Sequence, residues 1–116
     1  MSLERIFKAL VSLGLSQNDA RVYMFLALTG PKKALRIVRN LKISKQQICR
    51  SLKNLQNKGI IVADIENQNA FSALPFDKAL ESLIKMEKKQ TLIIQETNET
   101  LLSNWKTMIK KNSINS

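Results

Sequence analysis

Apolar residues recur at helical spacing through the first sixty residues, in four short segments separated by glycine, proline or polar turns. This period of about 3.6 residues predicts four amphipathic helices. They cover residues 3–13, the stretch between Ser16 and Gly30, residues 33–41 and residues 45–58. The side chains expected in the core are Ile6, Leu10 and Leu13, then Val22, Phe25, Leu26 and Leu28, then Leu35 and Val38, and finally Ile48, Leu52 and Leu55.

The pattern changes at Gly59, which stands where a left-handed residue commonly ends a helix. Residues 60–65 are rich in β-branched side chains and predict a strand. Residues 66–69 predict a polar turn and residues 70–73 a return strand, with Phe71 closing over the core. A helix, a three-residue turn, a second helix and a hairpin, in this order, are typical of a winged helix.

One long helix is predicted from residue 78 to about residue 111, because this stretch lacks Gly and Pro and follows Asp77 as an N-cap. An alternating spacing of three and four residues marks an apolar seam and favours a dimerising coiled coil. The seam comprises Leu80, Ile84, Ile94, Leu101, Trp105 and Met108. Glu87, Thr91 and Asn98 interrupt it, so two questions stay open: whether the helix folds back onto its own domain, and whether it pairs in parallel or antiparallel fashion.

These elements predict a mainly α fold with a small β-hairpin: a winged helix-turn-helix followed by a long C-terminal coiled-coil helix. With 116 residues, 44% of them hydrophobic, the chain is long enough for one compact core. Residues 1–76 are assigned to the winged helix-turn-helix DNA-binding domain, residues 77–111 to the dimerisation helix and residues 112–116 to a frayed tail.

The positive charge of the chain is concentrated in its N-terminal half. Residues 1–60 carry twelve Lys or Arg against Glu4 and Asp19, whereas residues 61–116 carry seven of each sign, so the first half holds the entire net charge of +10. No acidic residue stands between Asp19 and Asp64. Such an imbalance is typical of a surface that binds a polyanion, and with a winged helix the polyanion expected is double-stranded DNA.

The helix over residues 45–58 has side chains suited to reading base edges. Its face opposite Ile48, Leu52 and Leu55 points outward, at about 100° per residue. Glutamine pairs with adenine and arginine with guanine, and the first turns of a recognition helix enter the major groove. The residues expected to read bases are Lys45, Gln46, Gln47 and Arg50. Those expected to hold the DNA backbone are Lys32, Lys33, Arg36, Arg39, Lys42, Ser44, Lys53 and Asn57.

The segments that precede and follow this helix in the chain are expected to interact differently with phosphate. Ser44 and Gln47 match a capping box, which predicts the start of the recognition helix and an N-terminus that can hold a phosphate. The hairpin carries Asp64 and Glu66, which repel phosphate. The wing is therefore expected to graze the minor groove or to miss the DNA.

Composition offers little for catalysis. The chain has no His, its single Cys49 cannot build a zinc site, and its three glycines form no phosphate-binding loop. We expect neither an enzyme nor a metal or other cofactor.

Cys49 is interpreted as a small semi-buried packing residue, with a redox-sensing thiol as the alternative. No apolar run is long enough to span a membrane and the lone cysteine suits a reducing interior, so a cytoplasmic, nucleoid-associated protein is expected.

Residues 10–31 resemble the opening of the TrmB family of archaeal transcription regulators. The family shows a Leu-Gly-Leu-Ser turn, an Ala-Arg-Val-Tyr helix and a Gly-Pro break, as residues 13–16, 20–23 and 30–31 do here. The resemblance continues at residues 58–61 and 71–75, and covers roughly residues 3–80 by eye. It implies a dimeric DNA-binding regulator, often of sugar uptake and metabolism.

The chain departs from the family at three points. Cys49 stands where the family usually has Tyr, and the wing has Asp64, Glu66 and Asn67 where Gly and basic residues are frequent. Longer members carry a large effector domain after the linking helix, and this chain ends at Ser116. Sugar sensing is therefore not carried over, and no small-molecule effector is expected.

The function expected is sequence-specific binding of double-stranded DNA by a homodimer, on an inverted-repeat operator with half-sites about 34 Å apart. Two alternatives stay open: an architectural DNA-binding protein without sequence preference, and a winged-helix module that binds another protein. The operator sequence, the regulated genes and the sign of regulation do not follow from the sequence.

Overall fold

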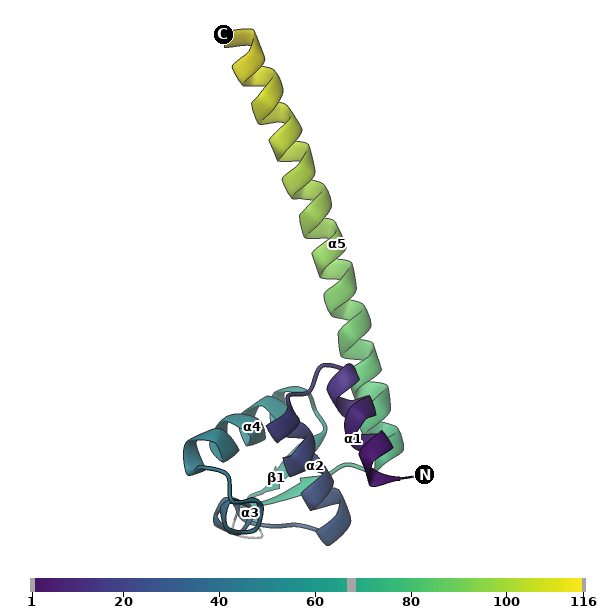
Figure 1. Cartoon of the computed structure of the whole chain (residues 1–116), viewed down its shortest axis with the longest axis vertical. Coiled ribbons are helices and arrows are strands. Elements are labelled where there is room, and N and C mark those ends of the chain that lie inside the picture. The colour runs from purple at the N-terminus through teal and green to yellow at the C-terminus, as the bar shows by residue number, and fades with distance from the viewer. Residues whose placement is uncertain (1, 67–68, 116) are drawn as a thin grey trace. The chain divides into compact units, whose positions relative to one another are not determined.

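The computed structural model describes residues 2–66 and 69–115, with side chains as far as residue 111. Its elements are α1 (Leu3–Ser12), α2 (Gln17–Thr29), α3 (Ala34–Leu41), α4 (Lys45–Asn57), β1 (Ile61–Asp64), β2 (Ala70–Ala73) and α5 (Phe76–Asn115) (Figure 1). The chain divides into two compact units, residues 1–86 and 87–116. The predicted fold class is confirmed, and the bounds of the first four helices lie within one residue of those expected. Within the described residues, no helix combines the length and apolarity needed to cross a membrane.

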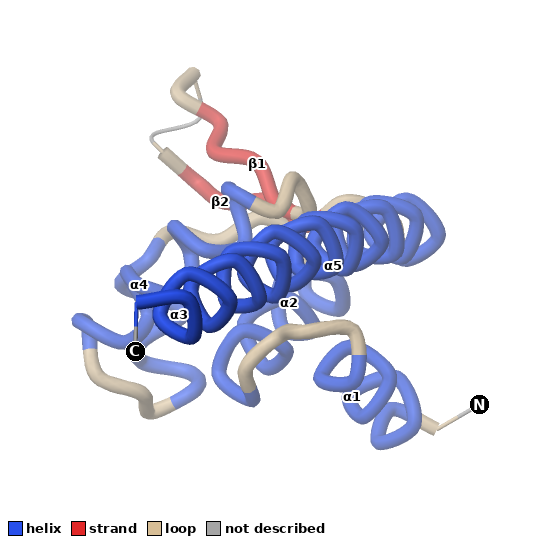
Figure 2. Tube along the Cα trace, turned by 90° about the horizontal axis from the view of Figure 1, so that it is seen from above, coloured by secondary structure: helices blue, strands red, loops and turns tan. Residues whose placement is uncertain are grey.

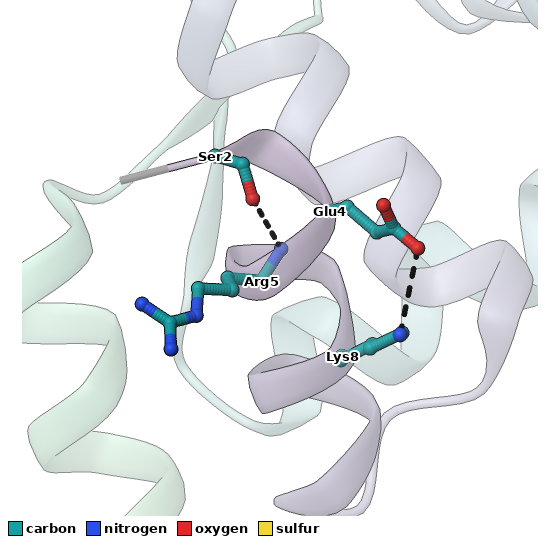
Figure 3. Close-up of polar contacts among 4 residues, drawn as sticks. All are labelled: Ser2, Glu4, Arg5 and Lys8. Carbon is teal, nitrogen blue, oxygen red and sulfur yellow. Dashed lines mark hydrogen bonds and ion pairs between the residues drawn. The ribbon is translucent and has the colours of Figure 1, made fainter.

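A serine caps α1, as Figure 3 shows. The Ser2 hydroxyl accepts a hydrogen bond from the Arg5 amide at 3.3 Å, which satisfies one of the amides that a helix N-terminus leaves without an acceptor. One turn further, the Lys8 ammonium lies 3.4 Å from the Glu4 carboxylate, with the two side chains 73% and 76% exposed. Solvent screens a pair this exposed, so it adds little stability.

Serines also cap the N-termini of α2 and α4. The Ser16 hydroxyl accepts from the Asp19 amide at 3.0 Å, and the Asp19 carboxylate accepts in return from the Ser16 amide at 3.4 Å. At α4 the Ser44 hydroxyl accepts from the Gln47 amide at 3.3 Å, so the predicted start of this helix is confirmed. The sequence suggested a capping box at Ser44; among the described residues, the complete box is the one at Ser16.

The core of the first unit draws apolar side chains from every helix and from the hairpin. All three residues predicted to face inward from α4 are buried, as are Leu10, Val22 and Leu26. Ile6, Leu13, Phe25 and Val38 are half-buried and pack against this core. Burial of the apolar side of α4 fixes which of its side chains reach solvent.

Two leucines predicted in the core are exposed instead. Leu28 is 62% exposed and Leu35 is 56% exposed. Each stands two residues from a fully buried side chain, Leu26 and Ile37 respectively, and two residues turn a helix by about 200°. The members of each pair therefore lie on opposite sides, and Ile37, which the sequence analysis overlooked, is the core residue of α3.

The strands β1 and β2 pair in antiparallel fashion, with Ile61 opposite Ala73, and lie side by side in Figure 2. The predicted first strand, residues 60–65, was one residue too long at each end. The predicted return strand, residues 70–73, is confirmed. Of the predicted turn, residues 67 and 68 lie outside the described residues.

The segment before α3 is attached to the hairpin. The Lys32 amide donates to the Phe71 carbonyl at 3.1 Å, and the Phe71 amide donates to the Lys32 carbonyl at 2.8 Å. Phe71 is half-buried against the core, as predicted. These two backbone hydrogen bonds hold the start of α3 beside β2. They link the wing, which consists of β1 and β2, to the first helix of the helix-turn-helix, which is α3.

The helix α5 exceeds its prediction at both ends. It begins at Phe76 rather than at residue 78, so Asp77 lies in its first turn instead of at the N-cap. It continues to Asn115, so the end predicted near residue 111 was wrong, and the expected frayed tail is helical over the part that is described. The residues before α5 contain Pro75, which suits entry into a helix because its ring presets the backbone.

The first turns of α5 belong to the first unit. Ala79 and Leu83 have 0% and 1% of their surface exposed and are part of the core. The first unit therefore extends to residue 86 instead of residue 76. The seam residues Leu80 and Ile84 fall within these turns, whereas folding of the rest of the helix back onto its own domain stays an open alternative.

Tyr23 ties α2 to the segment that leads into α5. Its hydroxyl donates to the Leu74 carbonyl at 2.7 Å, and 1% of the residue is exposed. Burial, together with the negative charge of Asp77, raises the pKa of Tyr23 from 10.0 to about 12. Both causes disfavour the phenolate, so the folded chain keeps this proton where an unfolded chain releases it.

This difference predicts how stability depends on pH. Below pH 10 the contribution of Tyr23 to the free energy of unfolding is fully present. As the pH rises from about 10 toward 12, the free energy of unfolding falls by on the order of 2 kcal/mol, because only the unfolded state has released the tyrosine proton. Tyr23 is the single tyrosine, so tyrosinate absorbance reports it alone. The folded protein should titrate near 12 and the urea-unfolded protein near 10. Equal midpoints would contradict the expected burial, and Tyr23→Phe should lack this part of the alkaline loss.

Candidate nucleic-acid interface

The outward face of α4 carries the residues predicted to read bases. Lys45, Gln46, Gln47 and Arg50 are all exposed and occupy the first two turns of the helix. The opposite face is buried in the core. The predicted orientation of this helix is therefore confirmed, whereas contact of these four side chains with DNA stays a prediction.

A polar hollow of about 560 Å³ lies between the start of α2 and the outer side of α4. The sequence analysis foresaw its α4 wall but not its α2 wall, because the residues concerned are separated by about thirty positions in the chain. Its lining residues are Ser16, Asn18, Asp19, Gln47, Arg50, Ser51, Lys53, Asn54 and Asn57. Four of these were predicted to contact DNA: Gln47, Arg50, Lys53 and Asn57.

A second hollow, of about 340 Å³, gathers cations at the start of α3. Lys32, Lys33 and Arg36 line it together with Pro31 and Ala70. The pairing of the Lys32 backbone with β2 brings the hairpin residue Ala70 to this place. Three of the residues assigned to the DNA backbone are therefore close neighbours, at a helix N-terminus that also favours anions.

Three bases of the acid-free stretch donate to carbonyl groups of their own chain. The Lys32 ammonium bonds the Thr29 carbonyl at 2.9 Å and the Pro31 carbonyl at 3.3 Å. The Arg21 guanidinium bonds the Leu41 carbonyl at 3.1 Å, and the Lys58 ammonium bonds the Gly14 carbonyl at 3.4 Å. Arg21 and Lys32 thereby satisfy carbonyl groups at the ends of α3 and α2.

The remaining residues assigned to the DNA backbone, Arg39, Lys42, Ser44, Lys53 and Asn57, are exposed. Within residues 2–66 and 69–115, the side chains of Arg36, Arg39, Lys42, Arg50 and Lys53 form no ion pair. Cations that form no ion pair within the chain remain available to attract phosphate. Asp64 and Glu66 lie on the hairpin side, where the Asp64 carboxylate accepts from the Glu66 amide at 3.1 Å.

Cys49 is exposed on α4, next to Arg50. The interpretation of Cys49 as a semi-buried packing residue was therefore wrong. It stands one residue after the buried Ile48, and one residue turns a helix by only about 100°, which carries the thiol past the edge of the core.

The seam residues of α5 fall into two groups. Leu80 is half-buried and Ile84 is 42% exposed, both in the first unit. In the second unit every described side chain is exposed, and the seam leaves 57% to 60% of each of its four large apolar side chains in contact with solvent. These are Ile94, Leu101, Trp105 and Met108. Single exposed apolar residues are ordinary, but four at seam spacing form a stripe, which Asn98 interrupts once.

Solved structures with this fold include an archaeal chromatin protein and transcription regulators. TrmBL2, described as an archaeal chromatin protein with a novel mode of DNA binding, matches with a TM-score of 0.71 at 18% identity, over 90% of this chain and 40% of that one. Two MarR family transcription regulators match with TM-scores of 0.51 (18% identity, 97% of this chain, 82% of that chain) and 0.53 (16%, 91% and 78%; from Silicibacter pomeroyi). At these identities the likeness concerns the fold alone, and this chain spans two fifths of the archaeal protein.

The sequence itself places the chain in a family. No curated protein matches it. Residues 10–77, more than half of the chain, match the family described as "Sugar-specific transcriptional regulator TrmB". The matched region contains α2, α3, α4 and the hairpin, hence the whole candidate interface in the first unit. This chain therefore belongs to the TrmB family of transcriptional regulators.

Proposed function

We propose that this protein is a transcriptional regulator that binds double-stranded DNA with sequence preference, as a homodimer on an inverted-repeat operator. The observation that carries the proposal is the outward face of α4. It presents Gln46, Gln47 and Arg50 to solvent, and cations without acidic neighbours flank it on α3 and in the turn between the two helices.

The chemistry of this face suits direct readout in the major groove. An arginine can bond O6 and N7 of guanine with two parallel hydrogen bonds, and a glutamine can bond N6 and N7 of adenine. The Ser44 hydroxyl accepts from the Gln47 amide, which fixes the first turn of α4. A preorganised first turn keeps the base-reading side chains at a defined depth in the groove.

The cations around α4 supply affinity without sequence information. Arg36 and Lys33 line one hollow, and Lys53 lines another together with the base-reading residues Gln47 and Arg50. Phosphate contacts from two sides fix the register of a helix on the duplex. Lys32 donates to its own chain at two carbonyl groups, so we assign it a small share of the DNA contact.

The exposed stripe on α5 supports a homodimer. Two copies that pair through Ile94, Leu101, Trp105 and Met108 would cover side chains that are otherwise more than half exposed. A two-fold dimer presents two recognition helices, and an operator read by them is an inverted repeat with half-sites one helical turn, about 34 Å, apart.

Leu101→Glu should convert the dimer to a monomer, because it places a charge in the middle of the seam. The chain offers a matched control in Leu92→Glu. Leu92 is 60% exposed, as is Leu101, but nine residues turn a helix by about 900°, which puts the two side chains on opposite faces. Sedimentation should report a monomer for the first variant and a dimer for the second. Equal behaviour of the two variants would contradict the assigned seam.

The single tryptophan offers a second readout of the same pairing. Trp105 is the chain's only Trp and 59% of it is exposed in one chain. Its emission should shift to shorter wavelength as the concentration rises through the dimer dissociation constant. Leu101→Glu should abolish this shift, while Leu92→Glu should retain it.

An architectural DNA-binding protein without sequence preference is the second candidate function. The archaeal TrmBL2 is described as a chromatin protein and shares this fold. The same cations would serve a protein that coats DNA, since phosphate contacts are independent of sequence.

Titration of labelled genomic fragments against competitor DNA at two salt concentrations separates these functions. A sequence-specific regulator retains selected fragments under a large excess of competitor, with a specificity ratio of about a thousand or more. An architectural protein gives a ratio near one. Absence of DNA binding at about 0.15 M salt, where charges are screened over about 8 Å, would favour a module that binds another protein and would contradict the proposal.

A further inference from the structure

Asp19 is a buried carboxylate that bonds across to the recognition helix. Only 4% of the residue is exposed, and Asp19 and Ser51 are the two buried polar residues in the part of the chain described. The sequence analysis counted Asp19 only as one of the two acidic residues of the N-terminal half. A buried carboxylate is costly unless its oxygens receive hydrogen bonds, so the partners of Asp19 show which groups it holds.

The partners of Asp19 lie on two different helices. Its carboxylate accepts from the Ser16 amide at 3.4 Å, within its own capping box, and from the side-chain amide of Asn54 on α4. The two residues of the second bond are 35 positions apart in sequence. This bond is therefore a polar link between the start of α2 and the recognition helix, at the base of the hollow between them.

Asn54 stands in the same row of α4 as the side chains proposed to contact DNA. Arg50 precedes it by four residues and Asn57 follows it by three, so the three lie along one side of the helix. Arg50, Asn54 and Asn57 all line the hollow that contains Asp19. A bond that fixes the direction of Asn54 about the helix axis also fixes the direction of Arg50.

Apolar packing defines this direction less sharply than a hydrogen bond does. Ile48, Leu52 and Leu55 attach α4 to the core, but hydrophobic contact is not directional, whereas a hydrogen bond is. A rotation of about 20° moves a group roughly 6 Å from the axis by about 2 Å. Recognition of a base requires placement within about 0.5 Å.

We propose that Asp19, acting through Asn54, is a positioning residue that fixes the rotation of α4 and so sets sequence preference. This inference rests on the proposed function. Asp19 itself does not contact DNA. Its bond decides whether the side chains of α4 meet the base edges, while the phosphate contacts from α3 are unaffected.

Asn54→Ala tests the proposal with the full chain. It removes the bond between α2 and α4 but leaves the capping box of Ser16 and Asp19 in place. The ratio of affinities for a selected fragment and for scrambled DNA should fall about tenfold, the effect of removing a hydrogen bond to a charged group. Affinity for scrambled DNA and its salt dependence should stay within about twofold of the wild type.

A control is Tyr23→Phe, which removes a different hydrogen bond between distant segments, the one to the Leu74 carbonyl. It should leave the affinity ratio unchanged. If Tyr23→Phe lowers the ratio as much as Asn54→Ala does, the effect follows from stability and the positioning role is wrong. An unchanged ratio in Asn54→Ala also overturns the proposal.

A second readout requires no DNA. Spin labels on the natural Cys49 of α4 and on a cysteine introduced by Lys8→Cys on α1 report the distance between two exposed sites of the first unit. Adding Asn54→Ala should broaden or shift this distance distribution, and an unchanged distribution would overturn the proposal. If the wild type shows no DNA binding or no preference, the proposed function fails, and the distance distribution then decides whether the bond holds α4.

Discussion

Raising the salt concentration from 50 to 200 mM should weaken DNA binding about a thousandfold for each protomer that contacts the DNA. Each phosphate neutralised by a cation releases condensed counterions, and the logarithm of affinity falls with the logarithm of salt by about 0.9 per neutralised phosphate. Six cations are assigned to phosphates in one protomer: Lys32, Lys33, Arg36, Arg39, Lys42 and Lys53. A titration by fluorescence anisotropy at several salt concentrations gives the slope directly.

The placement of the charge, and not only its amount, should determine this slope. Replacing Arg36 and Arg39 with Ala should reduce the slope by about two per protomer, because each substitution leaves one phosphate of each half-site without its cation. The matched control removes the same charge from α1, with Ala in place of Arg5 and Lys8, and should leave the slope near that of the wild type. Equal effects of the two double variants would mean that net charge alone drives binding, and would contradict the interface.

Arg50→Ala should lower affinity for the selected operator by about 1–3 kcal/mol, or roughly 5- to 150-fold, and relax preference at one base pair. The reason is that the variant cannot form the two hydrogen bonds to one guanine, while the phosphate contacts remain. Selection of binding sites from randomised DNA measures both changes.

A second cation on the same helix provides the comparison for Arg50. Lys53→Ala removes one positive charge, as Arg50→Ala does, but about one turn further from the start of α4. It should weaken binding to all sequences alike and lower the salt slope by about one per protomer. If Arg50→Ala leaves the preference intact, or if the two variants are indistinguishable, the assigned orientation of α4 in the groove is wrong.

Sequence analysis predicted helices and their buried faces well where apolar residues follow a single helical period. In α4 the buried residues Ile48, Leu52 and Leu55 follow the 3.6-residue period, so the outward face followed from them. The same rule was misapplied where apolar residues crowd together. Leu26 and Leu28 are two positions apart and cannot share a face, so an apolar run marks the presence of a helix better than it marks the buried side.

What sequence could not predict are the contacts between distant segments. The bond from Asn54 to Asp19 spans 35 positions, and the use of Lys32 and Arg21 to bond carbonyl groups of neighbouring helices depends on how those helices meet. The burial of Ala79 has the same origin, because a small residue at the start of α5 looks neutral until the helix packs against the core. Local sequence patterns carry no information about contacts between segments that are distant in the chain.

The turn between α3 and α4 holds Lys42 in a left-handed conformation, with a φ of 55°. For a side chain with a Cβ this geometry costs roughly 1 kcal/mol, whereas glycine adopts it freely. A lysine at this position thus gives up folding free energy while placing a cation between the two helices of the proposed interface. At this turn, the stability of the fold favours glycine, whereas affinity for nucleic acid favours lysine.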